Sequence, residues 1–235
     1  MININRKITF SIKRFVRLAL LVLGVTMFFS CNETDKDYAT EDSKLIWAQC
    51  GLKKELKFEV FNQAIIGYKK IKGKRNSEFI TIIDFSKPST QERMFIVDLK
   101  SKRLVEKSLV AHGKNSGGNY AKYFSNSFES NKSCLGFFLT GNAYDGNFGR
   151  SLTIKGLEKN INDNAERRHI VIHPSKFVNQ NTIKRRGMLS RSLGCAAIPE
   201  KEAQSIINKI KGGSCVFIYA NNKDYKLNSK FVRET

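Results

Sequence analysis

Two segments of the chain carry apolar residues at helical spacing. Over residues 52–71 the apolar positions follow one another in steps of three or four, and a lysine-rich stretch around Gly73 ends the pattern. Residues 200–211 place one alanine and three isoleucines on one face and are followed by a pair of glycines. We predict that both segments form amphipathic helices whose apolar faces pack against a core.

Short runs rich in β-branched and aromatic residues predict strands. Residues 79–85, 93–99 and 103–110 are separated by short turns, which is typical of consecutive antiparallel strands. Residues 135–140, 151–157, 169–173 and 215–219 predict four more. No repeat or hinge divides residues 45–235, so we expect a single mainly-β domain of the α+β class with flanking helices. Long polar connections around 113–133 and 175–192 are expected to be lids or binding loops.

The N-terminal segment, residues 1–30, has the pattern of a signal peptide. Five basic residues precede an uncharged run of 12 residues, whereas crossing a bilayer takes roughly 20. Phe28-Phe29-Ser30-Cys31 resembles a bacterial lipobox, so we expect a lipoprotein that begins at a diacylated Cys31. Cleavage at a nearby site, or an uncleaved anchor, is the alternative. Residues 31–44 would then be a polar tether, and the protein would be exported to the cell envelope, anchored in the membrane and facing the periplasm.

The composition is that of a globular protein with a strong basic excess. The 235 residues include 41 Lys and Arg against 21 Asp and Glu, and 41% are hydrophobic. With only three Pro and five Cys, the chain is not collagen-like, low-complexity or disulfide-dense. The charge favours an anionic partner such as nucleic acid, a membrane surface or a carboxylate-rich polymer. Nucleic acid is disfavoured, because the chain has an export signal and no recognised nucleic-acid-binding motif.

A cysteine in a turn of small residues is the strongest candidate for chemistry. In Arg191-Ser192-Leu193-Gly194-Cys195, the thiol of Cys195 is a candidate nucleophile. Gly194 permits a sharp turn that could aim backbone amides at an oxyanion. A buried structural cysteine in a tight turn is the alternative reading.

Three histidines are available as the base: His112, His169 and His173. The residues between the last two are Ile-Val-Ile, which favours a strand and would separate the two rings by about 13 Å, too far to share a zinc ion. We therefore predict no metal site and no cofactor. His173 ends this strand and could face the Cys195 turn, although a half-buried structural histidine fits the same pattern.

Larger parts of the chain resemble the L,D-transpeptidase (YkuD-like) catalytic domain, in its exported murein branch. His173, followed further along the chain by Ser192-Leu193-Gly194-Cys195, is similar to the family signature His…Ser/Thr-His-Gly-Cys in order and approximate spacing. Further matching stretches bring the similarity to roughly residues 50 to 220; they are 82–89, 110–117, 124–126, 135–137, 151–152, 156–158 and 162–165.

The resemblance implies a β-sandwich or barrel and an acyltransferase that acts on peptidoglycan stem peptides through a thioester. It implies that Cys195 is the nucleophile, that His173 is the general base, and that Ser192 and Gly194 shape the oxyanion hole. An L,D-carboxypeptidase or peptidoglycan hydrolase of the same fold, in which water resolves the thioester, is an alternative. A non-catalytic peptidoglycan-binding lipoprotein is another.

Three positions depart from the family pattern. Leu193 stands where the signature has its second histidine, and Ala197 stands where an asparagine is common. Pro174 replaces the small residue that usually follows the base, which leaves open what accepts the second hydrogen bond of the His173 ring.

Candidate substrate-binding residues follow from the chemistry of stem peptides, which carry several carboxylates. Arg191 is predicted to bind them, and three further arginines could attract or position the stems, or form a solvated basic face: Arg168, Arg185 and Arg186. His112 and Asn115 lie in a glycine-bounded loop that could line the cleft or form a structural turn. The remaining cysteines, Cys50, Cys134 and Cys215, predict no disulfide framework.

Overall fold

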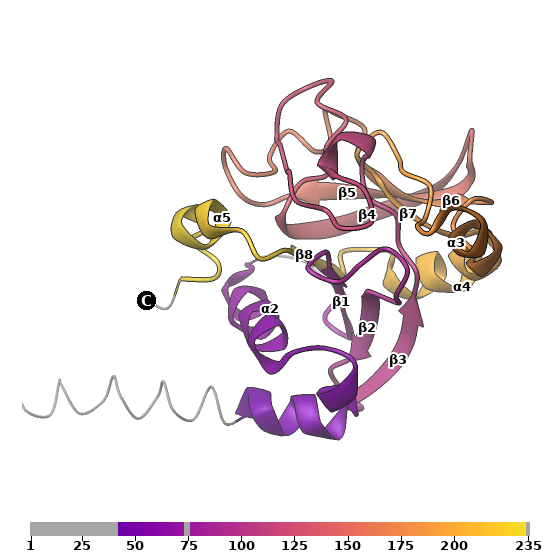
Figure 1. Ribbon diagram of the computed structural model, residues 1–235. Helices are drawn as coiled ribbons and strands as arrows, with labels where there is room; N and C mark the ends of the chain where they lie inside the picture. The colour runs from indigo at the N-terminus through magenta and orange to yellow at the C-terminus, as the bar shows by residue number, and fades with distance from the viewer. Residues whose placement is uncertain (1–41, 73–75, 234–235) are drawn as a thin grey trace, which may run out of the picture. The chain divides into compact units, whose positions relative to one another are not determined.

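The computed structural model describes residues 42–72 and 76–233, and the compact domain begins at Leu45. Within these residues one mixed sheet has the strand order β3-β2-β1-β8-β4-β5-β6-β7 (Figure 1). The strands are β1 (Phe79–Asp84), β2 (Met94–Asp98), β3 (Arg103–Ser108), β4 (Gly136–Gly146), β5 (Gly149–Gly156), β6 (Val171–Ser175), β7 (Ala196–Pro199) and β8 (Cys215–Tyr219). The predicted mainly-β domain of the α+β class is confirmed.

The sheet joins an early and a late part of the chain through its C-terminal strand. Strands β1, β2 and β3 pair antiparallel in sequence order, as predicted. Strand β8 lies between β1, to which it is parallel, and β4, to which it is antiparallel. Strands β4, β5 and β6 continue antiparallel, and β6 pairs with β7 in parallel at the far edge. This last pair carries the candidate site.

Two helices pack on the sheet with the faces that the sequence predicted. Helix α2 (Phe58–Lys70) contacts β1 and β8, and helix α4 (Glu200–Ile210) contacts β1 and β4 to β7. Strand β1 is buried at five of its six positions, so both faces of the sheet centre are covered. The buried helix residues are mainly aliphatic: Val60, Phe61, Ala64 and Ile65 in α2, and Ala203, Ile206, Ile207 and Ile210 in α4.

The prediction of one continuous helix over residues 52–71 is wrong at its start. A short 3₁₀ helix, η1 (Leu52–Lys54), is separated from α2 by an extended Lys57. Two backbone carbonyls that would accept hydrogen bonds within a continuous helix accept them from side chains instead. Lys87 Nζ donates to Glu55 O at 2.9 Å, and Trp47 Nε1 donates to Leu56 O at 2.8 Å. Hydrogen bonds from distant side chains thus override the local apolar period.

The predicted strand at residues 169–173 begins two residues late. His169 has a left-handed backbone (φ 54°) and ends a turn in which its amide bonds to Glu166 O and that of Ile170 to Ala165 O. The elements that were missed include η2 (Lys114–Ser116), α3 (Gln180–Arg186), β7 and α5 (Lys223–Asn228). Helix α3 has a readable start and end, since Asn179 Oδ1 caps Thr182 N and Gly187 ends the helix at φ 69°.

The predicted signal peptide, lipobox and most of the tether lie outside the described residues. No helix in the described segments is both long and apolar enough to cross a membrane.

Candidate active site

A pocket of about 880 Å³ lies at the β6–β7 edge of the sheet. Its walls come from β6, β7, the tip of the β4–β5 hairpin, the loop before α3, and the turn at residues 190–195 (Figure 1). Four predicted site residues line this pocket together: His173, Arg191, Ser192 and Cys195.

The register of β6 and β7 brings His173 and Cys195 to one face. Ile172 pairs with Ala196 and His173 with Ala197, and Cys195 directly precedes β7. Because side chains alternate along a strand, Cys195 shares the face of Ala197. His173 is therefore the diagonal neighbour of Cys195, and both residues line the same pocket. Two residues far apart in sequence thus lie one step apart across a parallel strand pair.

The His173 ring is held by a backbone carbonyl and an aromatic ring. Its Nδ1 lies 2.8 Å from Pro174 O, and because a carbonyl only accepts, Nδ1 carries the hydrogen. The other nitrogen, Nε2, then presents a lone pair. Phe148 stacks on the imidazole with centroids 4.7 Å apart. The second hydrogen bond that the Pro174 departure left open is thus made by Pro174 itself, through its carbonyl.

Burial favours the neutral form of both the thiol and the imidazole. Burial raises the pKa of the Cys195 thiol, while the Val171 amide and the Arg168 charge partly offset that increase. Burial lowers the pKa of His173, and the Pro174 carbonyl acts in the opposite direction. The Cys195 Sγ hydrogen bonds to His169 O at 3.5 Å. The pair is therefore suited to proton transfer during attack, rather than to a standing thiolate–imidazolium ion pair.

The turn before Cys195 depends on Gly194 and Ser192. Gly194 has φ 131°, and a Cβ there would lie 2.9 Å from Ile170 Cδ1 and 3.0 Å from Lys132 O, so only glycine fits. Ser192 Oγ donates to Cys195 O at 2.7 Å and accepts from Gly194 N at 3.1 Å. The Gly194 amide is engaged, so among the described residues the amides of Leu193 and Cys195 are the donors at this turn that could hold an oxyanion.

Arg168 holds the loop behind this turn, a role that the sequence did not indicate. Its Nη1 donates to Ser125 O at 2.6 Å and to Cys134 Sγ at 2.8 Å. Its Nη2 donates to Lys132 O at 2.8 Å and to a serine hydroxyl at 3.0 Å. These bonds make the guanidinium a support for the Cys195 turn. Arg168 also lines the pocket, so its predicted role in attracting carboxylates stays a prediction.

A second contact ties the same loop to the turn. Ser133 Oγ donates to Gly194 O at 3.0 Å and accepts from Gly113 N at the same distance. Gly113 also lies in the loop that follows Ala111, whose amide bonds to Ala197 O in β7 at 2.8 Å. Two loops far apart in sequence therefore fix the position of Cys195.

The predicted substrate-binding residues divide into one that reaches the pocket and two that do not. Arg191 lines it and also donates to Gly117 O at 3.2 Å. His112 is 1% exposed, with Nδ1 accepting from the buried Arg93 at 2.8 Å, so its predicted place in the cleft is wrong. Asn115 donates to Ser130 O at 2.9 Å and stabilises a loop outside the pocket lining.

The pocket rim contains apolar residues that the sequence analysis missed. Phe148 is 68% exposed, Leu193 65% and Phe177 50%, and all three line the pocket. The only signal was local: Phe148 stands between Asn147 and Gly149, in a turn where an aromatic residue has no core to enter. Leu193, the departure from the family histidine, thus contributes to the rim.

No group of three His, Cys, Asp or Glu side chains in the described segments could hold a metal ion. Of the cysteines described there, Cys50, Cys134 and Cys215 are buried and Cys195 is partly exposed.

We compared the chain with known proteins to identify its family. Similar solved structures include an L,D-transpeptidase from Mycobacterium smegmatis, at 10% identity over 61% of this chain and 59% of that chain, with a TM-score of 0.39. An L,D-transpeptidase from Stackebrandtia nassauensis is 11% identical over 77% of both chains, with a TM-score of 0.39. The chain thus spans about three fifths of the M. smegmatis protein. No curated protein matches it.

The family model of the L,D-transpeptidase catalytic domain matches residues 52–219, which run from η1 to the last residue of β8. This match includes all eight strands of the described sheet and every residue of the Cys195 turn. The chain therefore belongs to the L,D-transpeptidase catalytic domain family.

Proposed function

We propose that the protein is a cysteine-dependent peptidoglycan L,D-transpeptidase. His173 Nε2 takes the proton of Cys195 as Sγ attacks the amide carbonyl before the terminal D-residue of a tetrapeptide stem. The amides of Leu193 and Cys195 stabilise the oxyanion. The C–N bond breaks, His173 returns the proton to the departing amine, and a thioester remains. An amine of a second stem then attacks the thioester and releases the thiol.

The observation that carries this proposal is the shared face of Cys195 and His173 in a pocket open to solvent. The ring is oriented by Pro174 O, so the nitrogen with the lone pair is free for the thiol. Rotation of the Cys195 side chain from the His169 carbonyl toward the imidazole would begin the reaction.

Mass spectrometry of muropeptides tests the reaction. Purified protein is incubated with disaccharide tetrapeptides, alone and with a stem that offers only an acceptor amine. Both reactions release the terminal D-residue. Transpeptidation also yields cross-linked dimers, whereas a carboxypeptidase yields tripeptides and no dimers. No product, together with no acyl adduct at Cys195, would support the non-catalytic binding protein instead.

We further propose that the protein is exported and lipidated on Cys31. The support is the basic start, the short apolar run and the Ser30-Cys31 junction in the sequence. Intact mass and membrane fractionation test this: Cys31→Ala should leave the chain uncleaved or mislocalised. A wild-type protein that has no acyl mass and a different first residue would contradict the proposal.

A further inference from the structure

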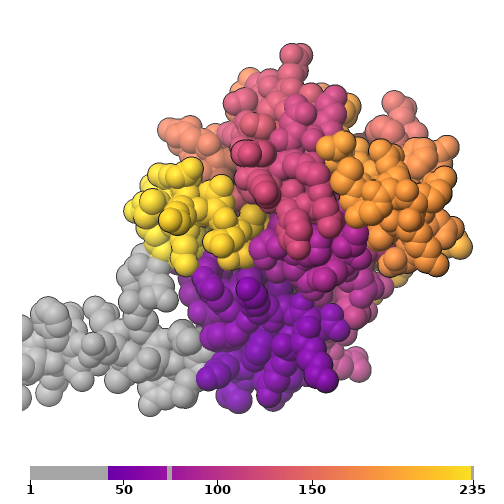
Figure 2. Space-filling view, in the orientation of Figure 1, coloured from indigo at the N-terminus to yellow at the C-terminus, as the bar shows by residue number. Residues whose placement is uncertain are grey.

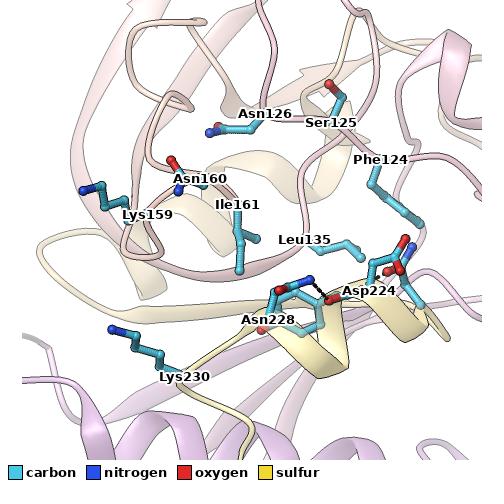
Figure 3. Close-up of a pocket in the computed structure, with 12 residues that line it drawn as sticks. Phe124, Ser125, Asn126, Leu135, Lys159, Asn160, Ile161, Asp224, Asn228 and Lys230 are labelled. Atoms are coloured by element: carbon cyan, nitrogen blue, oxygen red, sulfur yellow. Dashed lines mark hydrogen bonds between the residues drawn. The ribbon is translucent and has the colours of Figure 1, made fainter.

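A second pocket of about 640 Å³ lies between the loop at residues 124–126, the turn at 159–161 and helix α5. Figure 2 shows the C-terminal segment, in yellow, beside the pink middle part of the chain. Three partly or fully buried apolar side chains contribute to the lining: Phe124, Leu135 and Ile161. The other residues that we use are Lys159, Lys230, Asn160, Asn222, Asn228 and Asp224 (Figure 3).

The polar groups of this pocket are mostly nitrogen donors with no partner in the described residues. The ammonium groups of Lys159 and Lys230 and the side-chain amide of Asn160 are exposed. Asn222 uses Oδ1 to cap Tyr225 N at 2.7 Å, which leaves its Nδ2 for a ligand. Asn228 donates to Asp224 O at 2.8 Å, which leaves its Oδ1 as an acceptor (Figure 3).

The walls that carry these groups are fixed by hydrogen bonds of their own. Asn126 Nδ2 donates to Asp163 Oδ1 at 2.7 Å, and Asp163 Oδ1 also accepts from Asn160 N at 2.9 Å. Tyr225 donates to the buried Glu158 at 3.1 Å, which ties α5 to the turn across the pocket. The donors therefore start from a preorganised frame, which lowers the entropic cost of binding.

The charges indicate which ligand suits this pocket. Lys159 and Lys230 extend on one side and Asp224 lies on the other (Figure 3). Two cations and one anion favour a mostly neutral ligand with isolated carboxylates over a polyanion. The amide and ammonium groups can donate hydrogen bonds to hydroxyl and carbonyl oxygens, and the apolar residues can pack against the C–H groups of a ligand. An N-acetylated amino sugar bearing an occasional carboxylate offers all of these groups.

We propose that this pocket binds the glycan strand of peptidoglycan, so that the strand and its stem peptide contact two separate sites. The proposal rests on the proposed function for its choice of polymer. The two sites share a wall: Ser125 lines the glycan pocket, and its carbonyl accepts the 2.6 Å hydrogen bond from Arg168, which lines the Cys195 pocket. A strand held at this pocket would keep its stem peptides near the nucleophile.

Binding of stem-free glycan strands tests the inference directly. Strands released from peptidoglycan by an amidase are titrated against the purified protein, and free stem peptides are added as competitors. We expect binding that free stems do not displace. Asn160→Gly removes the amide at a position with φ 65°, where glycine is unstrained, and Lys159→Ala removes one cation. Each should weaken binding about ten-fold, because each removes a donor to a ligand oxygen.

The matched control is Lys155→Ala, since Lys155 is an exposed lysine of β5 outside the pocket lining. It should bind strands like the wild type. Cys195→Ala should also bind normally, so a failure of the proposed catalysis leaves this test intact. Unchanged binding in the Asn160 and Lys159 variants, no binding by the wild type, or equal binding of a single-stranded oligonucleotide would overturn the proposal.

Discussion

The turn that carries Cys195 has two unlike sides. Behind it, Arg168 and Ser133 make hydrogen bonds to the turn or to the loop that supports it. In front, Phe148, Phe177 and Leu193 project into solvent around the pocket. The fixed side positions the thiol, and the exposed side is available to the substrate. In the proposed reaction, the geometry of the chemical step is therefore set by the fixed side, and the stem would be recognised by the exposed side chains of the rim.

The largest effect should come from removing the nucleophile. If Cys195 is the nucleophile, the wild-type protein should form a covalent adduct with a carbapenem and Cys195→Ala should not, as measured by intact-protein mass. Cys134→Ala should retain it, because burial raises the pKa of that thiol to about 11 and it stays protonated. An adduct that persists in Cys195→Ala would show that another residue is the nucleophile.

Removing the base should slow acylation by about 10²–10⁴-fold. His173→Gln leaves the turn intact but offers no basic nitrogen to the thiol. The control is His169→Asn, because this exposed side chain stands at a left-handed position that asparagine tolerates. Equal losses in the two variants would contradict the assignment of the base.

The pH dependence of the acylation rate tests the assignment of His173 as the base. Only neutral His173 accepts the proton, and burial lowers its pKa below the ordinary 6.5. Acylation should therefore rise with pH and reach half its plateau below 6.5, as measured by single-turnover kinetics. A midpoint above that ordinary value would mean that the imidazole is more exposed than the structure places it.

Weakening the fixed side should have a smaller effect. Arg168→Gln loses the charge that favours the thiolate and several inward hydrogen bonds, so the pKa of Cys195 should rise and alkylation by iodoacetamide at pH 7 should slow about ten-fold. Arg168→Lys keeps the charge and should recover part of the rate. Arg167→Gln, next to it but exposed over Phe128, should behave like the wild type.

The smallest effect should come from the exposed side. Phe148→Ala removes the ring that stacks on His173 without touching the thiol or the hydrogen bond to Pro174 O. We expect KM for stem peptides to rise by about three- to ten-fold, as for loss of a stacked aromatic contact, with a smaller change in kcat. A fall in kcat larger than the rise in KM would erase the distinction between the two sides.

Sequence reasoning located strands β1 to β3, because their apolar and β-branched runs are local. It predicted the pairing of Cys195 with His173 only through the resemblance to the family, since the two residues are separated in sequence. It missed β7, since Ala196–Pro199 is short and lacks strong β-formers other than Ile198. It missed the support by Arg168, because that role depends on carbonyls 36 and 43 residues away in sequence. It misplaced His112 for the same reason, because the partner that buries it, Arg93, belongs to another element.

The carbonyl of Pro174 that orients His173 belongs to the main chain. A group of this kind has no pKa in the accessible range and is supplied by every amino acid. The residue at position 174 can therefore change without loss of this carbonyl, provided that the backbone conformation is kept. Proline restricts that conformation, because its ring fixes φ. The hydrogen-bond partner of His173 therefore depends on the backbone conformation and not on the identity of a side chain. An alignment that compares only side chains would not reveal it.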